Sequence, residues 1–405
     1  MQTRARSYGH PVAKPCHIVD MMECMPDFFE KEVLAKLSIT DRALFARAAH
    51  STKVADKPAV EALLKLEDFV ESLKMFKYYV GATKGRDWDA RVCEVIAKTG
   101  HLNVLKWARV QRPPCPWDGT TFDAAAGIGD VKTLRWLRKK GCPYGEYTCA
   151  RAAHNGHFRA LKWLRAQDPV CPWGTSTLQS AVGNGNVKIL DWLWDKGCAV
   201  MPDDVEDMCR EAVVNDKLAA LKWVRKLHFP WGVTCETAAE FGRLGILKWV
   251  RSQGCPWSAT TCENAALARN LDVLKWARKQ EPPCPWDERT CMVAVAEPEL
   301  EVLKWARAQD PPCPWDATTC KAAATLSQFE ALKWARAQEP PCPWDSQTML
   351  RAAHNGDVHM MQWAREQTPP CPWNELCCWM AHTEGHAEAL AWLLANGCPD
   401  EIQRT

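Results

Sequence analysis

The sequence carries almost no net charge, because 51 basic residues stand against 49 acidic ones and the formal net charge is +2. A protein that binds nucleic acid through bulk basicity is therefore not expected. No window approaches roughly 18 uncharged apolar residues, so we predict no membrane span. Residues 1–10 lack the apolar segment of a secretory signal. We expect a protein of the reducing cytoplasm or nucleus.

The sequence also lacks the short motifs that mark catalytic and cofactor sites. It contains no Gly-rich phosphate loop, no nucleophile elbow and no paired-carboxylate signature. The segment from His382 to His386 superficially resembles a zinc motif, but its Glu is misplaced for the metalloprotease order. Cys377 and Cys378 are adjacent and do not form a Cys-x-x-Cys pair. We therefore predict a protein that is not an enzyme and holds neither a cofactor nor a metal.

Tryptophan, in contrast, is abundant and periodic. One Trp of a recurring Leu-Lys-Trp-Ala-Arg segment falls at intervals that are mostly 29 residues, at positions 107, 136, 163, 192, 223, 249, 276, 305, 334, 363 and 392. A fixed period of this size is typical of solenoids built from stacked repeats. The sequence thus predicts eleven repeats between residues 91 and 398.

Each repeat predicts two short helices and a loop. Thr stands fifteen residues before the helix Trp in eight repeats, and we expect this Thr to cap the first helix (positions 121, 148, 177, 234, 261, 290, 319 and 348). A small-residue pair such as Ala152-Ala153 lets two helices approach closely. Gly156 is an example of the Gly that ends the first helix in a left-handed conformation. Pro pairs such as 311–312 stop the second helix.

This order of residues resembles the ankyrin repeat. Thr148, Ala152-Ala153, Gly156-His157 and Leu161-Lys162 match that family's Thr, Ala, Gly-His and Leu pattern. The family's period is about 33 residues, whereas the period here is shorter and a Cys-Pro-Trp-Asp loop joins the repeats. The resemblance implies an all-α, ankyrin-like solenoid with the first helices on a concave, partner-binding side.

The 21 cysteines first indicate a disulfide framework, but their positions favour another interpretation. Most occupy two positions of the repeat, in the loop and in the first helix, and other repeats place Phe122, Leu178, Met349 or Phe229 there. A position that accepts Cys, Phe, Leu and Met is an apolar packing position. A bridge within one repeat, for example from Cys313 to Cys320, is compatible with distance. We expect free, buried thiols.

The N-terminal part differs from the repeats. We divide the chain into an unstructured lead-in (1–20), a small helical module (21–56), a degenerate capping repeat (57–90), the repeats (91–398) and a tail (399–405). The module resembles an F-box, with a Pro start and apolar residues on one helical face: Pro26, Phe29, Leu34 and Leu37. The resemblance implies a substrate receptor whose residues 25–49 dock on the adaptor subunit of a cullin-type ubiquitin ligase. A helical cap over the first repeat is the alternative.

Two further regularities have structural explanations. We expect the periodic Trp side chains to form a ladder in the core. Arg two positions after the helix Trp, and Lys or Arg just before it, form a basic stripe along the second helices. The stripe could attract an acidic partner or nucleic acid. The favoured explanation is a solvated face whose Arg stems cover the loop Trp and pair with Asp118, Asp287, Asp316 and Asp345.

The most variable positions lie two, three, six and seven residues after the Thr, on the first helix. We predict that they bind a protein partner, and the alternative is drift at unconstrained surface positions. The candidate residues are Glu94, Asp123, Arg151, His154, Glu236, Phe241, Glu263, Met292, Lys321, Arg351, His354 and Trp379. The function we expect is a monomeric, non-catalytic protein-interaction scaffold, with nucleic-acid binding as the lower-ranked alternative.

Overall fold

The structure is a computed structural model that describes residues 73, 76–77, 89–200, 204–227 and 230–399. The F-box-like module and its residues Pro26, Phe29, Leu34 and Leu37 lie outside the described residues. The described helices belong to two compact units, here called unit 1 (Met1–Met201) and unit 2 (Pro202–Thr405).

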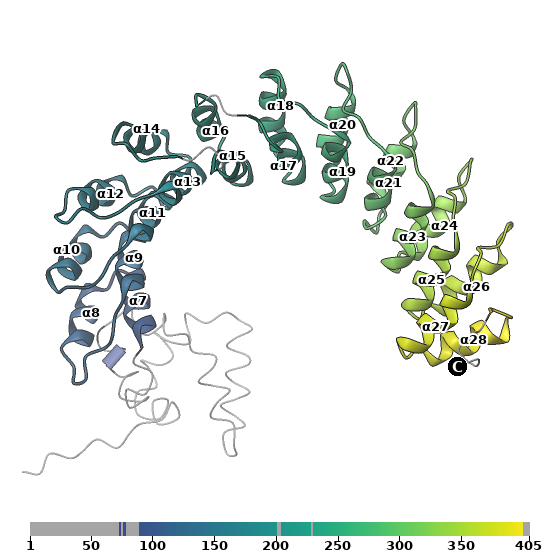
Figure 1. Cartoon of the computed structure of the whole chain (residues 1–405), viewed down its shortest axis with the longest axis horizontal. Helices are drawn as coiled ribbons and strands as arrows, with labels where there is room; N and C mark the ends of the chain where they lie inside the picture. Colours follow the sequence, from purple (N-terminus) through teal and green to yellow (C-terminus); the bar gives the residue numbers. More distant parts are fainter. Residues whose placement is uncertain (1–72, 74–75, 78–88, 201–203, 228–229, 400–405) are drawn as a thin grey trace, which may run out of the picture. The chain divides into compact units, whose positions relative to one another are not determined.

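Every regular element of the described residues is an α-helix, and consecutive helices form pairs (Figure 1). Unit 1 holds α7 (Ala90–Lys98), α8 (Leu102–Arg109), α9 (Gly119–Gly127), α10 (Val131–Lys139), α11 (Glu146–His154), α12 (Phe158–Arg165), α13 (Thr175–Asn184) and α14 (Val187–Asp195). Unit 2 holds α15 (Asp204–Val214), α16 (Leu218–Arg225), α17 (Thr234–Glu240), α18 (Leu244–Ser252), α19 (Ala259–Leu267), α20 (Leu271–Arg278), α21 (Glu288–Ala294), α22 (Glu301–Arg307), α23 (Ala317–Thr325), α24 (Phe329–Arg336), α25 (Ser346–His354), α26 (Val358–Glu366), α27 (Glu375–Thr383) and α28 (Ala387–Ala395). The predicted all-α solenoid is confirmed.

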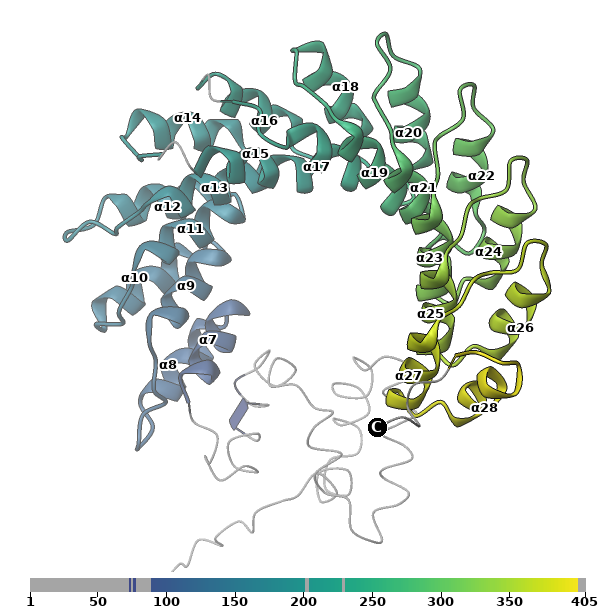
Figure 2. The same ribbon diagram turned by 45° about the vertical axis from the view of Figure 1, so that its right-hand side comes forward.

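Within each unit the first helices of the pairs, with odd numbers, lie side by side in one row, and the second helices form the other row (Figure 2). The core lies between the rows. Leu105, Leu134 and Leu161 of the second helices are fully buried there, as are the small residues Ala152 and Ala153 of a first helix. The two helices of this repeat are in contact, and burial of the Ala pair agrees with the predicted role of these small residues.

The first helix of most repeats ends at a glycine in the left-handed region. At Gly156, φ is 75°, and the next amide, of His157, donates to the Ala152 carbonyl over 2.8 Å. This confirms the predicted helix end. Where the glycine is replaced, another residue takes the same conformation, for example Leu300 with φ of 58°. A bulky residue is strained in this conformation. The packing of the repeat therefore imposes the turn even where no glycine is present.

The prediction that Thr is the cap residue of the first helix is wrong, because the residue before the helix takes that position in all eight repeats, and in four of them this residue is an Asp. There the cap is the Asp at the end of the loop: the carboxylate of Asp316 accepts from the Thr318 amide at 2.9 Å, and Asp118, Asp287 and Asp345 act alike. Thr319 lies three residues into the helix and is fully buried. The Asp side chains were predicted to pair with Arg, but their position at a helix N-terminus makes them caps.

In two other repeats the Thr does accept a hydrogen bond at the helix start. The Thr148 hydroxyl accepts from the Gly145 amide at 3.2 Å, and the Thr261 hydroxyl accepts from the Ser258 amide at 3.4 Å. Each of these Thr residues lies in the first turn, and the residue before the helix is the cap. The Thr therefore supports the helix start from within the helix.

The predicted Trp ladder exists, but it lies at the edge of the second-helix row and not in the core. Each described loop Trp, from Trp117 onwards, meets the helix Trp of the next repeat edge to face, as Trp315 and Trp334 do with ring centroids 6.2 Å apart. Most of these rings are only partly buried. The Arg of the basic stripe covers the loop Trp, and the guanidinium of Arg307 lies 3.9 Å from the Trp315 ring centroid. That side chain also donates to the Cys313 carbonyl.

Every described cysteine is free and buried, which confirms the packing interpretation. Most loop thiols also connect the loop to its own repeat, since they donate to the carbonyl of the residue that caps the first helix, whereas Cys255 donates to the Pro256 carbonyl. Cys342 reaches the Asp316 carbonyl at 3.4 Å and Cys371 the Asp345 carbonyl at 3.5 Å. Burial raises the pKa of Cys142 and of Cys371 to about 12. These thiols are therefore protonated at neutral pH.

Candidate binding surface on the first helices

The helical period decides which side chains of the first helices face away from the core. In α9, Thr121, Phe122 and the pair Ala125-Ala126 are buried. Thr120, Asp123, Ala124 and Gly127 fall on the opposite side and remain partly or fully exposed. Exposed and buried residues alternate in the same way in α7, α11 and α13. Because these first helices lie side by side (Figure 2), their exposed side chains share one surface of unit 1.

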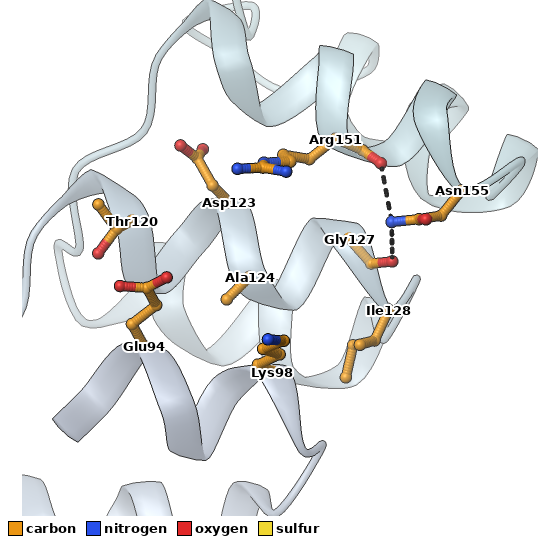
Figure 3. Close-up of a pocket in the computed structure, with 9 residues that line it drawn as sticks. All are labelled: Glu94, Lys98, Thr120, Asp123, Ala124, Gly127, Ile128, Arg151 and Asn155. Carbon is orange, nitrogen blue, oxygen red and sulfur yellow. Dashed lines mark hydrogen bonds between the residues drawn. The ribbon is translucent and has the colours of Figure 1, made fainter. Parts of the chain in front are cut away.

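A hollow of about 300 Å³ lies on this surface across α7, α9 and α11 (Figure 3). Its lining residues are Glu94, Lys98, Thr120, Asp123, Ala124, Gly127, Ile128, Arg151 and Asn155. Ala124 and Gly127 supply no long side chain, which leaves space between the charged groups. Figure 3 shows the Arg151 guanidinium reaching towards Asp123, with Glu94 and Lys98 on the α7 side. The hollow thus presents both acidic and basic groups to a ligand.

Asp123 is the most perturbed carboxyl of this hollow. Burial raises its pKa above the ordinary value, while the Thr148 hydroxyl, which donates to it, and the Arg151 charge lower that pKa in part. The neighbouring Asp118 and Glu94 carboxylates raise it further. Loss of water from a carboxylate without a full set of compensating partners is unfavourable. A partner that brings a hydrogen-bond donor to Asp123 would relieve this cost.

A second hollow, of about 400 Å³, continues the first across α9, α11 and α13. It is lined by Asp123, Tyr147, Ala150, Arg151, His154, Ser176, Gln179 and Ser180. Asp123 and Arg151 belong to both hollows. Four residues predicted from sequence, Glu94, Asp123, Arg151 and His154, therefore line one connected surface of unit 1.

One column of this surface was not predicted from the sequence. Thr120, Tyr147 and Ser176 each stand one residue before the repeat Thr position, and all three line the hollows. Tyr147 is 65% exposed. The helical period contained the signal, because a residue three positions before Asp123 lies on the same helix face. Lys98 and Gln179 also line the hollows. They stand at repeat positions that the sequence analysis identified as variable, but they were not among the candidate residues.

In unit 2 several of the predicted residues hold neighbouring repeats together. The Glu236 carboxylate accepts from the Ser258 hydroxyl at 3.0 Å, and the Glu263 carboxylate lies 4.0 Å from the Arg289 guanidinium. Phe241 and Met292 are partly buried. The contacts of Glu236 and Glu263 give these two side chains structural roles at the junctions between repeats.

The remaining predicted residues, Lys321, Arg351, His354 and Trp379, lie on three consecutive first helices, α23, α25 and α27. The His354 ring nitrogen Nδ1 is 3.5 Å from the Glu384 carboxylate. Trp379 is 51% exposed. They form a second group of candidate residues within unit 2.

The basic stripe on the second helices is only partly available to ligands. Its Arg side chains stack on the loop Trp, with distances of 3.7 to 4.0 Å from guanidinium carbon to ring centroid at Arg165 and Arg336. The Lys and Arg column before the helix Trp is more exposed, as at Lys106 and Lys248. A hollow of about 560 Å³ at the start of the second helices is lined by cations of this side, among them Lys132, Arg135 and Arg159.

Clustered metal ligands and membrane-spanning helices are both absent from the described ranges. Within residues 89–200, 204–227 and 230–399, no group of three or more His, Cys, Asp or Glu side chains is arranged to hold a metal ion. None of the helices α7 to α28 is both long enough and apolar enough to cross a membrane.

The sequence matches no known protein family and no curated protein. Among solved structures, it is similar to the pentatricopeptide repeat protein PPR10 in complex with an 18-nt psaJ RNA element, with 13% identity and a TM-score of 0.39 over 93% of this chain. The chain spans 65% of the length of that protein. It is also similar to an ankyrin repeat family protein from Legionella pneumophila, with 14% identity and a TM-score of 0.14 over 91% of each chain. These similarities are too distant to support any conclusion about this chain. Its own helix pairs show that it is a helical repeat protein.

Proposed function

We propose that this chain is a non-catalytic protein-interaction scaffold that holds a partner on the first helices of unit 1. The observation that supports this most strongly is the pair of connected hollows that share Asp123 and Arg151. Extended rows of exposed side chains on stacked repeats are the usual binding surfaces of solenoids. Arg and Tyr, which are enriched at interface hot spots, both lie there as Arg151 and Tyr147.

A charge reversal at the centre of this surface tests the proposal. Arg151 is exposed, and Arg151→Glu should abolish capture of the partner by the full-length protein while its melting temperature stays near that of the wild type. Lys188→Glu on α14 makes the same charge change on the second-helix side and should leave capture intact. Equal capture by wild type and both variants would refute the proposed surface.

The finer role that we propose is that of a substrate receptor in a cullin-type ubiquitin ligase. Its support is the F-box resemblance of residues 25–49, in which Pro26, Phe29, Leu34 and Leu37 are the expected anchors. Full-length protein should co-purify with the adaptor subunit, and a Pro26→Ala/Leu34→Ala variant should not. Failure of the wild type to bind the adaptor would remove the ubiquitin role and leave the scaffold role in place.

A second candidate function is binding of nucleic acid or another acidic partner on the second-helix side. The hollow lined by Lys132, Arg135 and Arg159, together with the exposed Lys column, favours it. Such binding should weaken steeply with added salt, because each neutralised phosphate releases counterions. Affinity that does not change with salt would exclude this candidate.

A further inference from the structure

One six-residue segment occurs twice, once in each compact unit. Residues 151–156 and 351–356 both read Arg-Ala-Ala-His-Asn-Gly. Both segments lie at the end of a first helix, α11 in unit 1 and α25 in unit 2. In each, the Asn amide reaches back to the equivalent carbonyl at the end of the preceding first helix: Asn155 donates to the Gly127 carbonyl at 2.7 Å and Asn355 to the Thr325 carbonyl at 3.0 Å. The two places therefore share one backbone register, and their neighbours can be compared position by position.

The neighbour of the Arg differs in charge between the two places. In unit 1, Asp123 on α9 stands two positions after the buried Thr121 and offers its carboxylate to Arg151. In unit 2 the equivalent residue, two positions after the buried Thr319, is Lys321 on α23. The Arg of unit 1 therefore has a carboxylate as its neighbour, whereas the Arg of unit 2 has a second cation.

These two cations have no partner within the part of the chain that the structure describes. No hydrogen bond or ion pair there engages the Lys321 ammonium, and the Nε of Arg351 is buried without a hydrogen-bond partner. Both side chains are partly buried, whereas Arg151 is exposed. The repeat register places these two like charges on the neighbouring helices α23 and α25, and an anion bound there would offset their repulsion.

The following first helix, α27, carries two exposed apolar side chains near these cations. Helix α25 packs between α23 and α27. On α27, Leu376 is 44% exposed and Trp379 51% exposed. Their equivalents in unit 1, Ser176 and Gln179, line the same hollow as Arg151. The repeat register therefore places the two large apolar side chains beside Arg351, where unit 1 has small or polar ones.

We propose that this surface of unit 2, made of Lys321, Arg351, Leu376 and Trp379, binds an acidic peptide segment that carries a large apolar side chain. Carboxylates of the segment pair with the two cations, for which the planar Arg fork is well suited. Its apolar side chain packs on Trp379 and Leu376. The inference rests on the proposed scaffold function and names the partner class for a second site of the same kind.

Charges around the surface favour a peptide over a nucleic acid. Glu384 lies 3.5 Å from the His354 ring, and Glu375 is exposed at the start of α27. A phosphodiester chain carries a negative charge at every step and would meet these carboxylates as well as the cations. A peptide can place its acidic residues only where the cations are. The exposed aromatic and aliphatic side chains also match the composition of interface hot spots.

The test uses full-length protein and a fluorescent, glutamate-rich peptide with a central Leu-Phe pair, followed by fluorescence anisotropy. Wild type should bind it, and Lys321→Glu/Arg351→Glu should weaken binding by at least about tenfold, because two charge-assisted contacts are lost. Trp379→Ala should weaken binding by about tenfold as well. Lys188→Glu, an exposed charge reversal on α14 of unit 1, is the control and should change the affinity less than about twofold.

Three outcomes would overturn the inference. The first is absence of peptide binding by the wild type, and the second is equal binding by wild type and the Lys321→Glu/Arg351→Glu variant. The third is tighter binding of a single-stranded RNA than of the peptide with the same dependence on Lys321 and Arg351, which would make this a nucleic-acid site. If the peptide does not bind but partner capture still depends on Arg151, only the inference about unit 2 is refuted and the proposed function is unaffected. Peptide binding without Arg151-dependent capture would refute only the unit 1 surface.

Discussion

The stack of Arg307 on Trp315 offers the sharpest test of what joins a second helix to its loop. The guanidinium carbon lies 3.9 Å from the ring centroid, and Nη1 donates to the Cys313 carbonyl. Arg307→Ala removes both contacts and leaves that carbonyl without this donor. The perturbation is local, because Arg307 is the last residue of α22 and Ala is compatible with a helix end.

The expected loss of stability combines the two contacts with one offset. A hydrogen bond from a charged donor contributes about 1.5–3 kcal/mol, and partial exposure reduces this towards 1 kcal/mol. The cation–π contact contributes about 0.5–1 kcal/mol at such a site. The Nε of Arg307 is buried without a hydrogen-bond partner, which is unfavourable in the folded protein. Arg307→Ala removes this group as well, and that gain offsets part of the loss of stability. The expected net loss is about 1–2 kcal/mol.

Equilibrium urea unfolding of the full-length protein measures this loss. Arg307→Lys should recover only part of it, since the ammonium lacks the planar fork that both stacks and donates. Lys248→Ala on α18, an exposed position, is the matched control and should change the free energy of unfolding by less than about 0.5 kcal/mol. If Arg307→Ala also stays below about 0.5 kcal/mol, the stack does not stabilise the repeat and the reasoning is refuted.

Three other predictions concern the cap, the thiols and the perturbed carboxyl. Asp316→Ala should destabilise the protein by about 1 kcal/mol through loss of the α23 cap, whereas Asp316→Asn should be close to neutral in the same unfolding assay. Cys371 is buried and its pKa is raised to about 12, so iodoacetamide at pH 8 should not alkylate it until the protein is unfolded. Mass spectrometry measures the alkylation, and rapid labelling of the folded protein would contradict the burial of this thiol. Because burial raises the pKa of Asp123, its charged form is disfavoured in the folded state, so Asp123→Asn should stabilise the protein at pH 7. The gain should shrink as the pH falls through the raised folded-state pKa and should be lost below the unfolded-state pKa of about 3.9; a gain that is independent of pH would contradict this.

The repeat period and the helix ends could be predicted because their causes are local. Gly156 ends α11 through its own left-handed conformation, and the Pro pair at 311–312 prevents α22 from continuing into the loop. The surface columns were also accessible, since the helical period alone separates the buried Thr121 and Phe122 from Asp123. These features depend on a few consecutive residues and not on the rest of the fold.

The features that could not be predicted depend on contacts between segments. Asp316 and Thr319 are both good capping residues, and only the path of the loop decides that the Asp comes first. Trp315 is partly buried because Arg307 stacks on its ring and Trp334 of the next repeat packs against it, an arrangement that composition does not encode. The division of the chain near residue 201 likewise has no clear signal in the sequence of the repeats.

The central claim is that a protein partner binds the first-helix surface of unit 1, and photo-crosslinking tests it most directly. A photoreactive benzoylphenylalanine is placed at Tyr147, 65% exposed on that surface, or at Val110, 73% exposed in the loop after α8. We predict that the partner crosslinks at position 147 and not at position 110. Crosslinking at 110 with none at 147 would contradict the claim.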